Sequence, residues 1–218
     1  ERLGNRNHAI EALGRAMQVS SSDRLVLQTL ARLYAMAGEH EHLAHVLAHE
    51  VETVRRPHER VALLHRIGTI YDKQLGRDKD AQRWYESALS EAPIFSPSLA
   101  ALDALYSRSE AWQALIVMYL AAAENQNDSL LRASAHRRIA ETFEIRLGQP
   151  NPAMIHHAMA LVLDPSLQAS FKSLARMYAD HGMYRELIEL HQRAIDRAGT
   201  DNEVAIAHLF QIGACYED

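Results

Sequence analysis

Residues 61–93 read VALLHRIGTIYDKQLGRDKDAQRWYESALSEAP, and this stretch decides the fold class. Apolar and small residues recur at helical spacing on both sides of Leu75-Gly76, so they form one stripe on each of two helices. Gly76 suits the left-handed conformation that follows a helix C-terminus, and Asp78 can cap the next helix. The stretch therefore predicts a helix, a tight turn and a second helix that stops at Pro93. The stripe residues are Leu64, Ile67, Gly68, Tyr71, Ala81, Tyr85, Ala88 and Leu89.

The same pattern returns at an interval of 72 residues. Leu3-Gly4 and Leu147-Gly148 stand one interval before and one interval after Leu75-Gly76. A shared interval at many apolar and small positions indicates an internal repeat. The matching sets include Ala9, Ala81 and Ala153; Ala16, Ala88 and Ala160; Leu30, Leu102 and Leu174; Tyr34, Tyr106 and Tyr178; and Leu43, Leu115 and Leu187.

The composition excludes several classes of protein. The 218 residues include 23 Lys and Arg against 28 Asp and Glu, a net charge of −5, which lacks the basic excess of a nucleic-acid binder. Hydrophobic residues make up 48%, enough for a folded core. The single Cys excludes an internal disulfide framework and a zinc site built on several thiolates. No apolar run approaches the ~18 residues of a membrane span.

The repeated residues resemble the tetratricopeptide repeat family. That family places a large residue, Leu, a small residue and Tyr on a first helix, and Ala, an aromatic residue, Ala and Pro on a second. Two features depart from the family: corresponding positions recur every 35 to 38 residues rather than about 34, and one extra residue precedes Gly76 and Gly148. The slots are filled by Leu64, Ile67, Gly68, Tyr71, Ala81, Tyr85, Ala88 and Pro93, and most are filled again by Ile139, Ala140, Phe143, Ala153, His157, Ala160 and Pro165.

We therefore predict an all-α fold, an α-solenoid of tandem antiparallel helix hairpins. Each helix pair leaves an apolar face that only a neighbouring pair can cover. The resemblance implies a right-handed superhelix whose first helices line a concave face. Small residues, such as Gly68 and Gly213, are expected to let paired helices approach closely. The predicted single solenoid of residues 1–218 divides into half repeats at 1–22 and 200–218 and helix-hairpin repeats at 23–56, 57–94, 95–126, 127–166 and 167–199.

Both ends of the chain are expected to be unpaired half repeats. The sequence does not begin with Met, and Leu209, Phe210, Ile212 and Tyr216 give the last helix an apolar face. We interpret the chain as a fragment of a longer protein that carries more of these repeats. If no further repeat covers these ends, we expect the chain to self-associate through them, because their apolar faces need a partner.

Histidines form the sharpest cluster of chemically active side chains. His42, His45 and His49 share one helical stripe, and imidazoles four residues apart can chelate a metal. We favour a solvated polar stripe, because Leu43 and Leu47 occupy the packed face, and keep metal binding as the alternative. His157 and His191 occupy slots for aromatic residues and are interpreted as packed imidazoles, with pH sensing as the alternative.

No catalytic motif stands out in the sequence. There is no Gly-rich phosphate loop and no nucleophile elbow, and the serines at 20–22 with Asp23 are interpreted as a loop and a helix cap. Carboxylates at helical spacing are interpreted as a solvated face. Cys215 is interpreted as a packed thiol. We therefore expect no enzyme activity and no cofactor.

The resemblance implies a protein-interaction scaffold or adaptor that binds a partner peptide or domain on its concave face. One alternative is an RNA-binding helical-repeat protein, which the net acidic charge disfavours. Another is a regulatory module of a larger enzyme whose catalytic part lies elsewhere. We expect a protein or peptide partner of acidic or mixed charge, no nucleic acid and no membrane span, and favour the cytoplasm as the compartment.

The family resemblance also implies which residues face the groove. They lie two before and two after the Leu or Ile slot of each first helix, and five and six after it. Several are basic, which favours carboxylates on the partner. Acidic residues interrupt the basic row and favour a mixed-charge partner. The candidate groove residues are Gln28, Arg32, His65, Thr69, Asp72, Lys73, Arg108, Arg137, Glu141, Glu144, Lys172 and Arg176.

Overall fold

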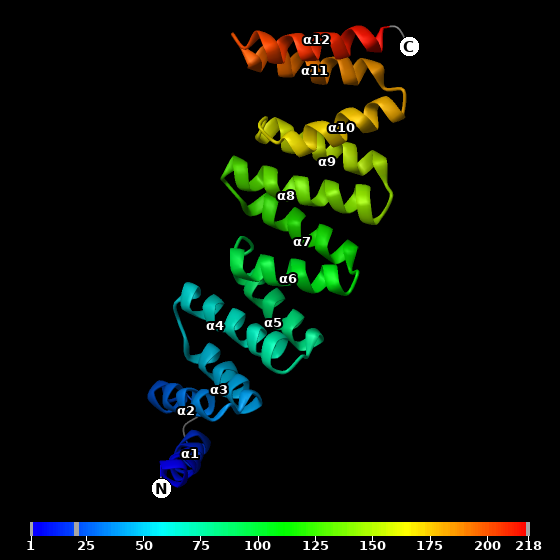
Figure 1. The fold of residues 1–218 in the computed structure, drawn as a ribbon. Coiled ribbons are helices and arrows are strands. Elements are labelled where there is room, and N and C mark those ends of the chain that lie inside the picture. The colour runs from blue at the N-terminus through cyan, green and yellow to red at the C-terminus, as the bar shows by residue number, and fades with distance from the viewer. Residues whose placement is uncertain (1, 20–21, 217–218) are drawn as a thin grey trace. The chain divides into compact units, whose positions relative to one another are not determined.

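A computed structural model describes residues 2–19 and 22–216 (Figure 1). These residues form twelve α-helices and no β-strand, which confirms the predicted all-α solenoid class. The predicted turn at Ser20 and Ser21 lies outside them. The helices are α1 (Arg2–Val19), α2 (Arg24–Ala37), α3 (His40–Thr53), α4 (Pro57–Thr69), α5 (Asp78–Glu91), α6 (Ser96–Arg108), α7 (Trp112–Asn125), α8 (Ser129–Glu141), α9 (Pro150–Leu163), α10 (Gln168–Asp180), α11 (Tyr184–Ala198) and α12 (Asn202–Cys215).

The chain divides into two compact units. Unit 1 is Glu1–Leu115 and unit 2 is Ile116–Asp218, so α7 begins in one unit and continues in the other. In unit 1 each helix from α1 to α6 packs against the next. In unit 2 the same holds from α8 to α12. Consecutive helices thus cover one another's apolar stripes, as a stacked helical repeat requires.

Local sequence signals set the helix ends. The Asp23 carboxylate accepts hydrogen bonds from the backbone N–H groups of the first turn of α2, and Asp128 does the same for α8. Pro57 and Pro150 occupy the first positions of α4 and α9. The tight turn predicted at Gly76 is confirmed, because its φ is +62°, a left-handed conformation that favours glycine.

The extra residue before Gly76 and Gly148 has a structural cause. A π-helical turn, Ile70–Gln74, continues α4, and another, Thr142–Arg146, continues α8. In each, a backbone N–H donates to the carbonyl five residues earlier, Leu75 to Ile70 and Leu147 to Thr142, both at 3.1 Å. A π turn absorbs one residue without breaking the helix. The turn Ile70–Gln74 carries the predicted groove residues Asp72 and Lys73, and the turn Thr142–Arg146 carries Glu144.

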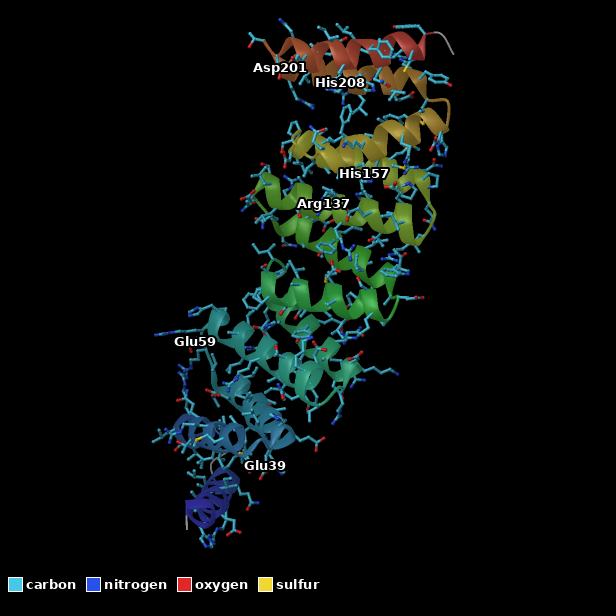
Figure 2. All side chains as sticks on the ribbon, viewed as in Figure 1. Glu39, Glu59, Arg137, His157, Asp201 and His208 are labelled. Atoms are coloured by element: carbon cyan, nitrogen blue, oxygen red, sulfur yellow. The ribbon has the colours of Figure 1, made fainter. Side chains whose placement is uncertain are left out.

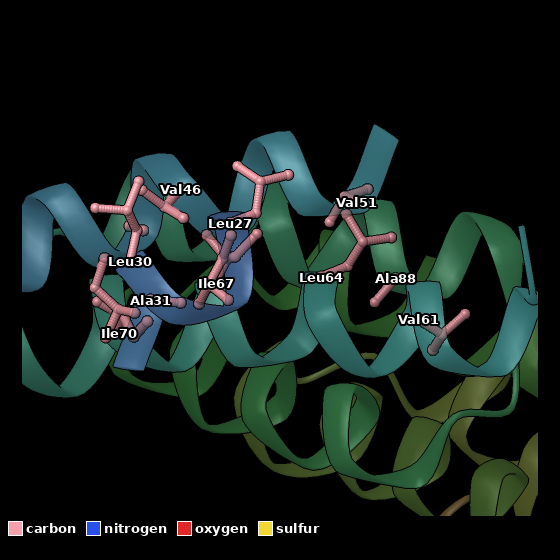
Figure 3. Packing of buried hydrophobic residues seen from close by; sticks show 13 residues of the cluster. Leu27, Leu30, Ala31, Val46, Val51, Val61, Leu64, Ile67, Ile70 and Ala88 are labelled. Carbon is pink, nitrogen blue, oxygen red and sulfur yellow. The ribbon is translucent and has the colours of Figure 1, made fainter. Parts of the chain in front are cut away.

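Buried aliphatic side chains from α2 to α5 form the core of unit 1. Figure 3 shows Leu27, Leu30, Ile67 and Leu64 pointing between these helices. Leu27 and Ile67 are fully buried. A second cluster in unit 2 joins α9, α10 and α11 through residues that include Leu161, Leu174 and Leu190. The residues of the predicted stripes therefore form the cores that hold successive helices together.

Small residues bring some paired helices close together, as predicted, but not all. Ala81 and Ala88 are fully buried, and the side chain of Tyr85 lies against Gly68. The same prediction is wrong for Gly213, where an added Cβ would meet no described atom within 4 Å. Gly213 lies on the exposed α12, whose described residues are never fully buried.

Candidate functional site

A cavity of about 530 Å³ lies in unit 1 beside the helices α2, α3 and α4. Two predicted groove residues, Gln28 and Arg32, line it from α2. Glu50 of α3 and Arg66 of α4 complete its polar lining. The apolar part of the lining comes from Ala31, Ala35, Met36 and Leu63.

The charges of this cavity are unbalanced. Glu50 is only 6% exposed, and its Oε1 accepts a hydrogen bond of 3.0 Å from Nε2 of Gln28. Arg32 and Arg66 are exposed, and within residues 2–19 and 22–216 neither guanidinium has an ion pair. Two cations thus face one carboxylate that is already hydrogen-bonded. The cavity can accept at least one further carboxylate through charge-assisted hydrogen bonds.

His65 and Thr69 of α4 join helices instead of standing free in a groove. Nδ1 of His65 lies 3.1 Å from Oγ of Ser98, and its ring packs against Tyr85 at a centroid distance of 5.2 Å. The Tyr85 hydroxyl donates to Oγ1 of Thr69 at 3.3 Å. Burial lowers the pKa of His65. A neutral, half-buried imidazole contributes to packing between α4, α5 and α6 more than to the charge of the surface.

Asp72, Lys73 and Arg108 form one charged network in unit 1. Asp72 accepts from Nζ of Lys73 at 2.8 Å and from the Arg108 guanidinium at 3.1 Å. The same Arg108 nitrogen lies 2.9 Å from Asp78. Burial raises the pKa of Asp72, but the hydrogen bonds from Lys73 and Arg108 outweigh it, and the net pKa lies below its usual value. These cations are already engaged by carboxylates of the chain.

The predicted residues of unit 2 pair with one another in the same way. Arg137 of α8 donates to Glu141 one turn later, and Arg176 of α10 donates to Glu144. Nε2 of the buried His157, from α9, lies 3.0 Å from the other oxygen of Glu144. Figure 2 labels Arg137 and His157 on neighbouring helices. The acidic residues that interrupt the basic row therefore neutralise Arg137 and Arg176.

Sequence reasoning missed the partners that complete these clusters. Glu50 lies on a second helix, outside the positions that the family resemblance assigns to the groove. Arg66 stands directly before the Ile67 slot, and Asp78 begins the helix after the π turn. The charges of these three residues are visible in the sequence, and Arg66 and Asp78 stand close to predicted positions along the chain. The contacts across helices are not visible there, because they depend on how the pairs stack.

In the histidine stripe of α3, His42 and His45 are exposed and His49 is half-buried, and each ring contacts a nearby side chain. His42 stacks on Tyr34 at a centroid distance of 5.1 Å and lies 3.2 Å from Glu39. His45 and His49 meet edge to face at 4.8 Å. Across the described ranges, no group of three or more His, Cys, Asp or Glu side chains could hold a metal ion.

His157 and His191 are packed imidazoles, as predicted from their aromatic slots. Both are almost fully buried, and Nδ1 of His191 lies 2.8 Å from Nδ1 of His208. A similar pair occurs on α8 and α9, where Nδ1 of His136 lies 3.1 Å from Nδ1 of His156. In each pair one nitrogen must donate and the other accept, so both rings cannot be protonated at once without losing the hydrogen bond.

None of the helices among the described residues is long and apolar enough to cross a membrane.

Several solved structures resemble the chain. The MamA protein is 13% identical, with 82% of this chain and 93% of that chain covered and a TM-score of 0.48. YrrB, described as a TPR protein with an unusual peptide-binding site, is 18% identical, with 91% and 97% covered and a TM-score of 0.47. The C-terminal part of a TPR repeat-containing protein from Cytophaga hutchinsonii is 13% identical, with 98% and 92% covered and a TM-score of 0.46.

Comparison with curated protein sequences gives no match. Two segments of the chain, residues 63–94 and 170–204, match the family model of the tetratricopeptide repeat. The first segment covers most of α4 and α5 with the π turn between them, and the second covers most of α10 and all of α11. These two segments are therefore similar to tetratricopeptide repeats, and they lie within an all-helical solenoid.

Proposed function

We propose that the chain is a protein-interaction module and that the cavity beside α2, α3 and α4 binds an acidic segment of a partner protein. The observation that supports this is the pair of unengaged guanidinium groups, Arg32 and Arg66, around one satisfied carboxylate, Glu50. A partner carboxylate between two guanidinium groups would form charge-assisted hydrogen bonds, which are stronger than neutral ones.

The lining of the cavity also determines which kind of side chain should stand next to the acidic residue of the partner. Met36 and Leu63 line it beside the two arginines. An apolar side chain next to the carboxylate would cover these groups and exclude water, which strengthens the ion pairs. The proposed ligand is therefore a segment with Asp or Glu beside a large apolar residue. Since the receptor helices are already packed, little ordering of the chain opposes binding.

The remaining predicted groove residues have a secondary role in the proposed binding, after Arg32 and Arg66. Arg108, Arg137 and Arg176 are engaged by carboxylates of the chain, so a partner must compete with these to reach them. Lys172 is exposed and has no ion pair in the described part of the chain. Within unit 2, a partner that reaches Arg137, Lys172 and Arg176 would meet cations and the carboxylates paired with two of them, which suits a partner of mixed charge.

A selection from a library of random short peptides tests the proposal. The purified chain should enrich peptides with Asp or Glu beside an apolar residue. The variant Arg32→Glu with Arg66→Glu should weaken the selected peptides by about tenfold or more, because it replaces attraction with repulsion. Fluorescence anisotropy of labelled peptides measures the affinity.

The matched control is Lys79→Glu with Arg83→Glu on α5, which changes the net charge by the same amount at exposed positions outside the cavity. It should leave the affinity almost unchanged. Peptides without acidic enrichment, or equal losses in both variants, would contradict the proposal. Displacement of the peptides by single-stranded RNA would instead favour a nucleic-acid partner.

A further inference from the structure

A second cavity, of about 680 Å³, lies in unit 2, and we name it the α9 groove. The helix α9 provides most of its lining, with α8 contributing Arg132 and His136 and α10 contributing Tyr178. Its volume falls within the range of about 300–1,000 Å³ that is typical of binding pockets. None of the predicted groove residues of unit 2 lines it.

An apolar ridge on α9 borders this groove. Ile155, Met159 and Val162 line the cavity and are spaced four and three residues apart, so they lie on one face of the helix. Their side chains are 59%, 45% and 72% exposed. Single exposed apolar residues are common on protein surfaces, but a contiguous row beside a cavity marks an interaction site. Met159 can adapt its shape to a partner, because its side chain is unbranched and flexible.

The groove also contains a cationic side chain. Arg132 lines it, and Nε of this guanidinium is buried without a hydrogen-bond partner. The lining includes no Asp or Glu, and Arg132 has no ion pair among the described residues. The neighbouring His136 is hydrogen-bonded through Nδ1 to His156, and burial, followed by the charge of Arg132, lowers its pKa. A partly buried cation without a carboxylate is unfavourable unless a ligand supplies one.

We infer that the α9 groove binds an amphipathic helix of a partner protein, whose apolar face covers Ile155, Met159 and Val162 and whose acidic residue pairs with Arg132. This site lies in unit 2 and shares no residue with the cavity of Arg32 and Arg66, so it goes beyond the proposed function. The charge complementarity between Arg132 and an acidic residue determines the orientation of the partner helix along α9.

The chemistry of the wall favours a helix over an extended segment. Along the ridge the wall is apolar and offers the partner few hydrogen-bond groups. An extended peptide would bury backbone N–H and C=O groups there without partners, whereas a helix satisfies these groups internally. The ridge from Ile155 to Val162 spans about 10 Å at the rise of an α-helix, which two turns of a partner helix can cover. Apolar residues at such spacing are the usual anchors of helix-in-groove recognition.

The test uses a displayed library of helical peptides that keep apolar residues at positions i, i+4 and i+7 and vary one flanking position among Glu, Gln and Lys. The selected peptides should retain Glu, and Val162→Glu should weaken their binding by about tenfold or more. Ile206→Glu is the matched control, since Ile206 is 64% exposed on α12, outside the groove, and this variant should bind as the wild type does. Circular dichroism confirms that both variants remain folded.

Arg132→Gln tests the cationic group of the site. This variant should abolish the preference for Glu over Gln while peptides that carry Gln still bind. The double variant Arg32→Glu with Arg66→Glu should leave these peptides unaffected, so failure of this inference and failure of the proposed function can be distinguished. No enrichment, equal losses for Val162→Glu and Ile206→Glu, or a Glu preference that survives Arg132→Gln would overturn the inference. Concentration-dependent dimers in sedimentation that Val162→Glu abolishes would also overturn it, in favour of a second copy of the chain.

Discussion

The aromatic ring of Tyr85 lies directly against Gly68. A Cβ atom added at Gly68 would stand 2.6 Å from both Cδ1 and Cε1 of that ring, closer than real contacts allow. Tyr85 has little room to move, because it is 1% exposed and its hydroxyl donates to Thr69. The absence of a side chain at Gly68 therefore sets how closely α4 and α5 pack.

Gly68→Ala is expected to destabilise the chain by about 1–3 kcal/mol, the usual effect of overpacking a tight contact. The sign of this stability change is informative, because replacing Gly by Ala at an uncrowded helical position stabilises a protein by up to about 1 kcal/mol. Gly213→Ala is the matched control: it adds the same methyl group on α12, where no described atom lies within 4 Å, and should be neutral or stabilising. Urea unfolding measures both. Equal effects at the two glycines would contradict the packing of Tyr85 on Gly68.

Ala88→Leu is expected to destabilise by about 1–3 kcal/mol, because Ala88 is fully buried within the core of unit 1. His45→Ala, on the exposed stripe of α3, should change the free energy of unfolding by less than about 0.5 kcal/mol. Thermal unfolding followed by circular dichroism checks both variants. A large effect of His45→Ala would show that the histidine stripe is part of the core.

The sequence predicted the helix pairs and much of their packing, because apolar residues at spacings of three and four report directly on buried faces. Gly68 and Ala88 were identified from this pattern alone. Gly213 was not, because a small residue signals close packing only where a neighbouring helix is present. The extra residue before Gly76 was visible as a departure from the repeat, but only the backbone shows that a π turn absorbs it.

Asp72→Asn is expected to remove a stabilising contribution that depends on pH. The pKa of Asp72 in the folded chain lies below its usual value, so its contribution is fully present above the unfolded pKa of about 3.9 and disappears as the pH falls through the folded pKa. The stability difference between wild type and Asp72→Asn should therefore shrink when the pH is lowered from 7 into the acidic range. Asp180→Asn, at an exposed position, is the control. A difference that does not change with pH would contradict the network of Asp72 with Lys73 and Arg108.

Acidification near neutral pH is expected to destabilise unit 2 through its paired histidines. Burial lowers the pKa of His136, His156 and His191, so the stability that they contribute is complete above the unfolded pKa of about 6.5 and declines as the pH falls below it. The melting temperature should fall between about pH 7 and pH 5, and His136→Asn with His156→Asn should flatten this decline.

His42→Asn with His45→Asn on the exposed stripe of α3 is the control for this pair and should leave the pH dependence unchanged. Circular dichroism melting curves over a series of pH values make the comparison. The same decline in all three proteins would mean that the histidine pairs of unit 2 do not set the pH dependence.

The candidate site was less predictable than the fold. Position along a first helix identified Arg32 and Arg108 equally well, but the structure separates them: Arg108 lies between Asp72 and Asp78, whereas Arg32 has no ion pair within the described residues. The difference depends on which carboxylates the neighbouring helices bring within reach. The row of cations read from the sequence is therefore largely neutralised. Among the described residues, its members Arg32 and Lys172 have no ion pair, and Arg66 adds a second such cation beside Arg32 in the cavity of unit 1.

A charge swap between the chain and a selected acidic peptide tests the role of Arg32 and Arg66 most directly. Isothermal titration calorimetry would compare the wild type and the Arg32→Glu, Arg66→Glu variant, each with the selected peptide and with the same peptide carrying Lys in place of its Asp or Glu. The wild type should prefer the acidic peptide by about tenfold or more, and the variant should prefer the Lys peptide. If both proteins bind the two peptides with the same order of affinity, recognition of a partner carboxylate by these arginines is contradicted.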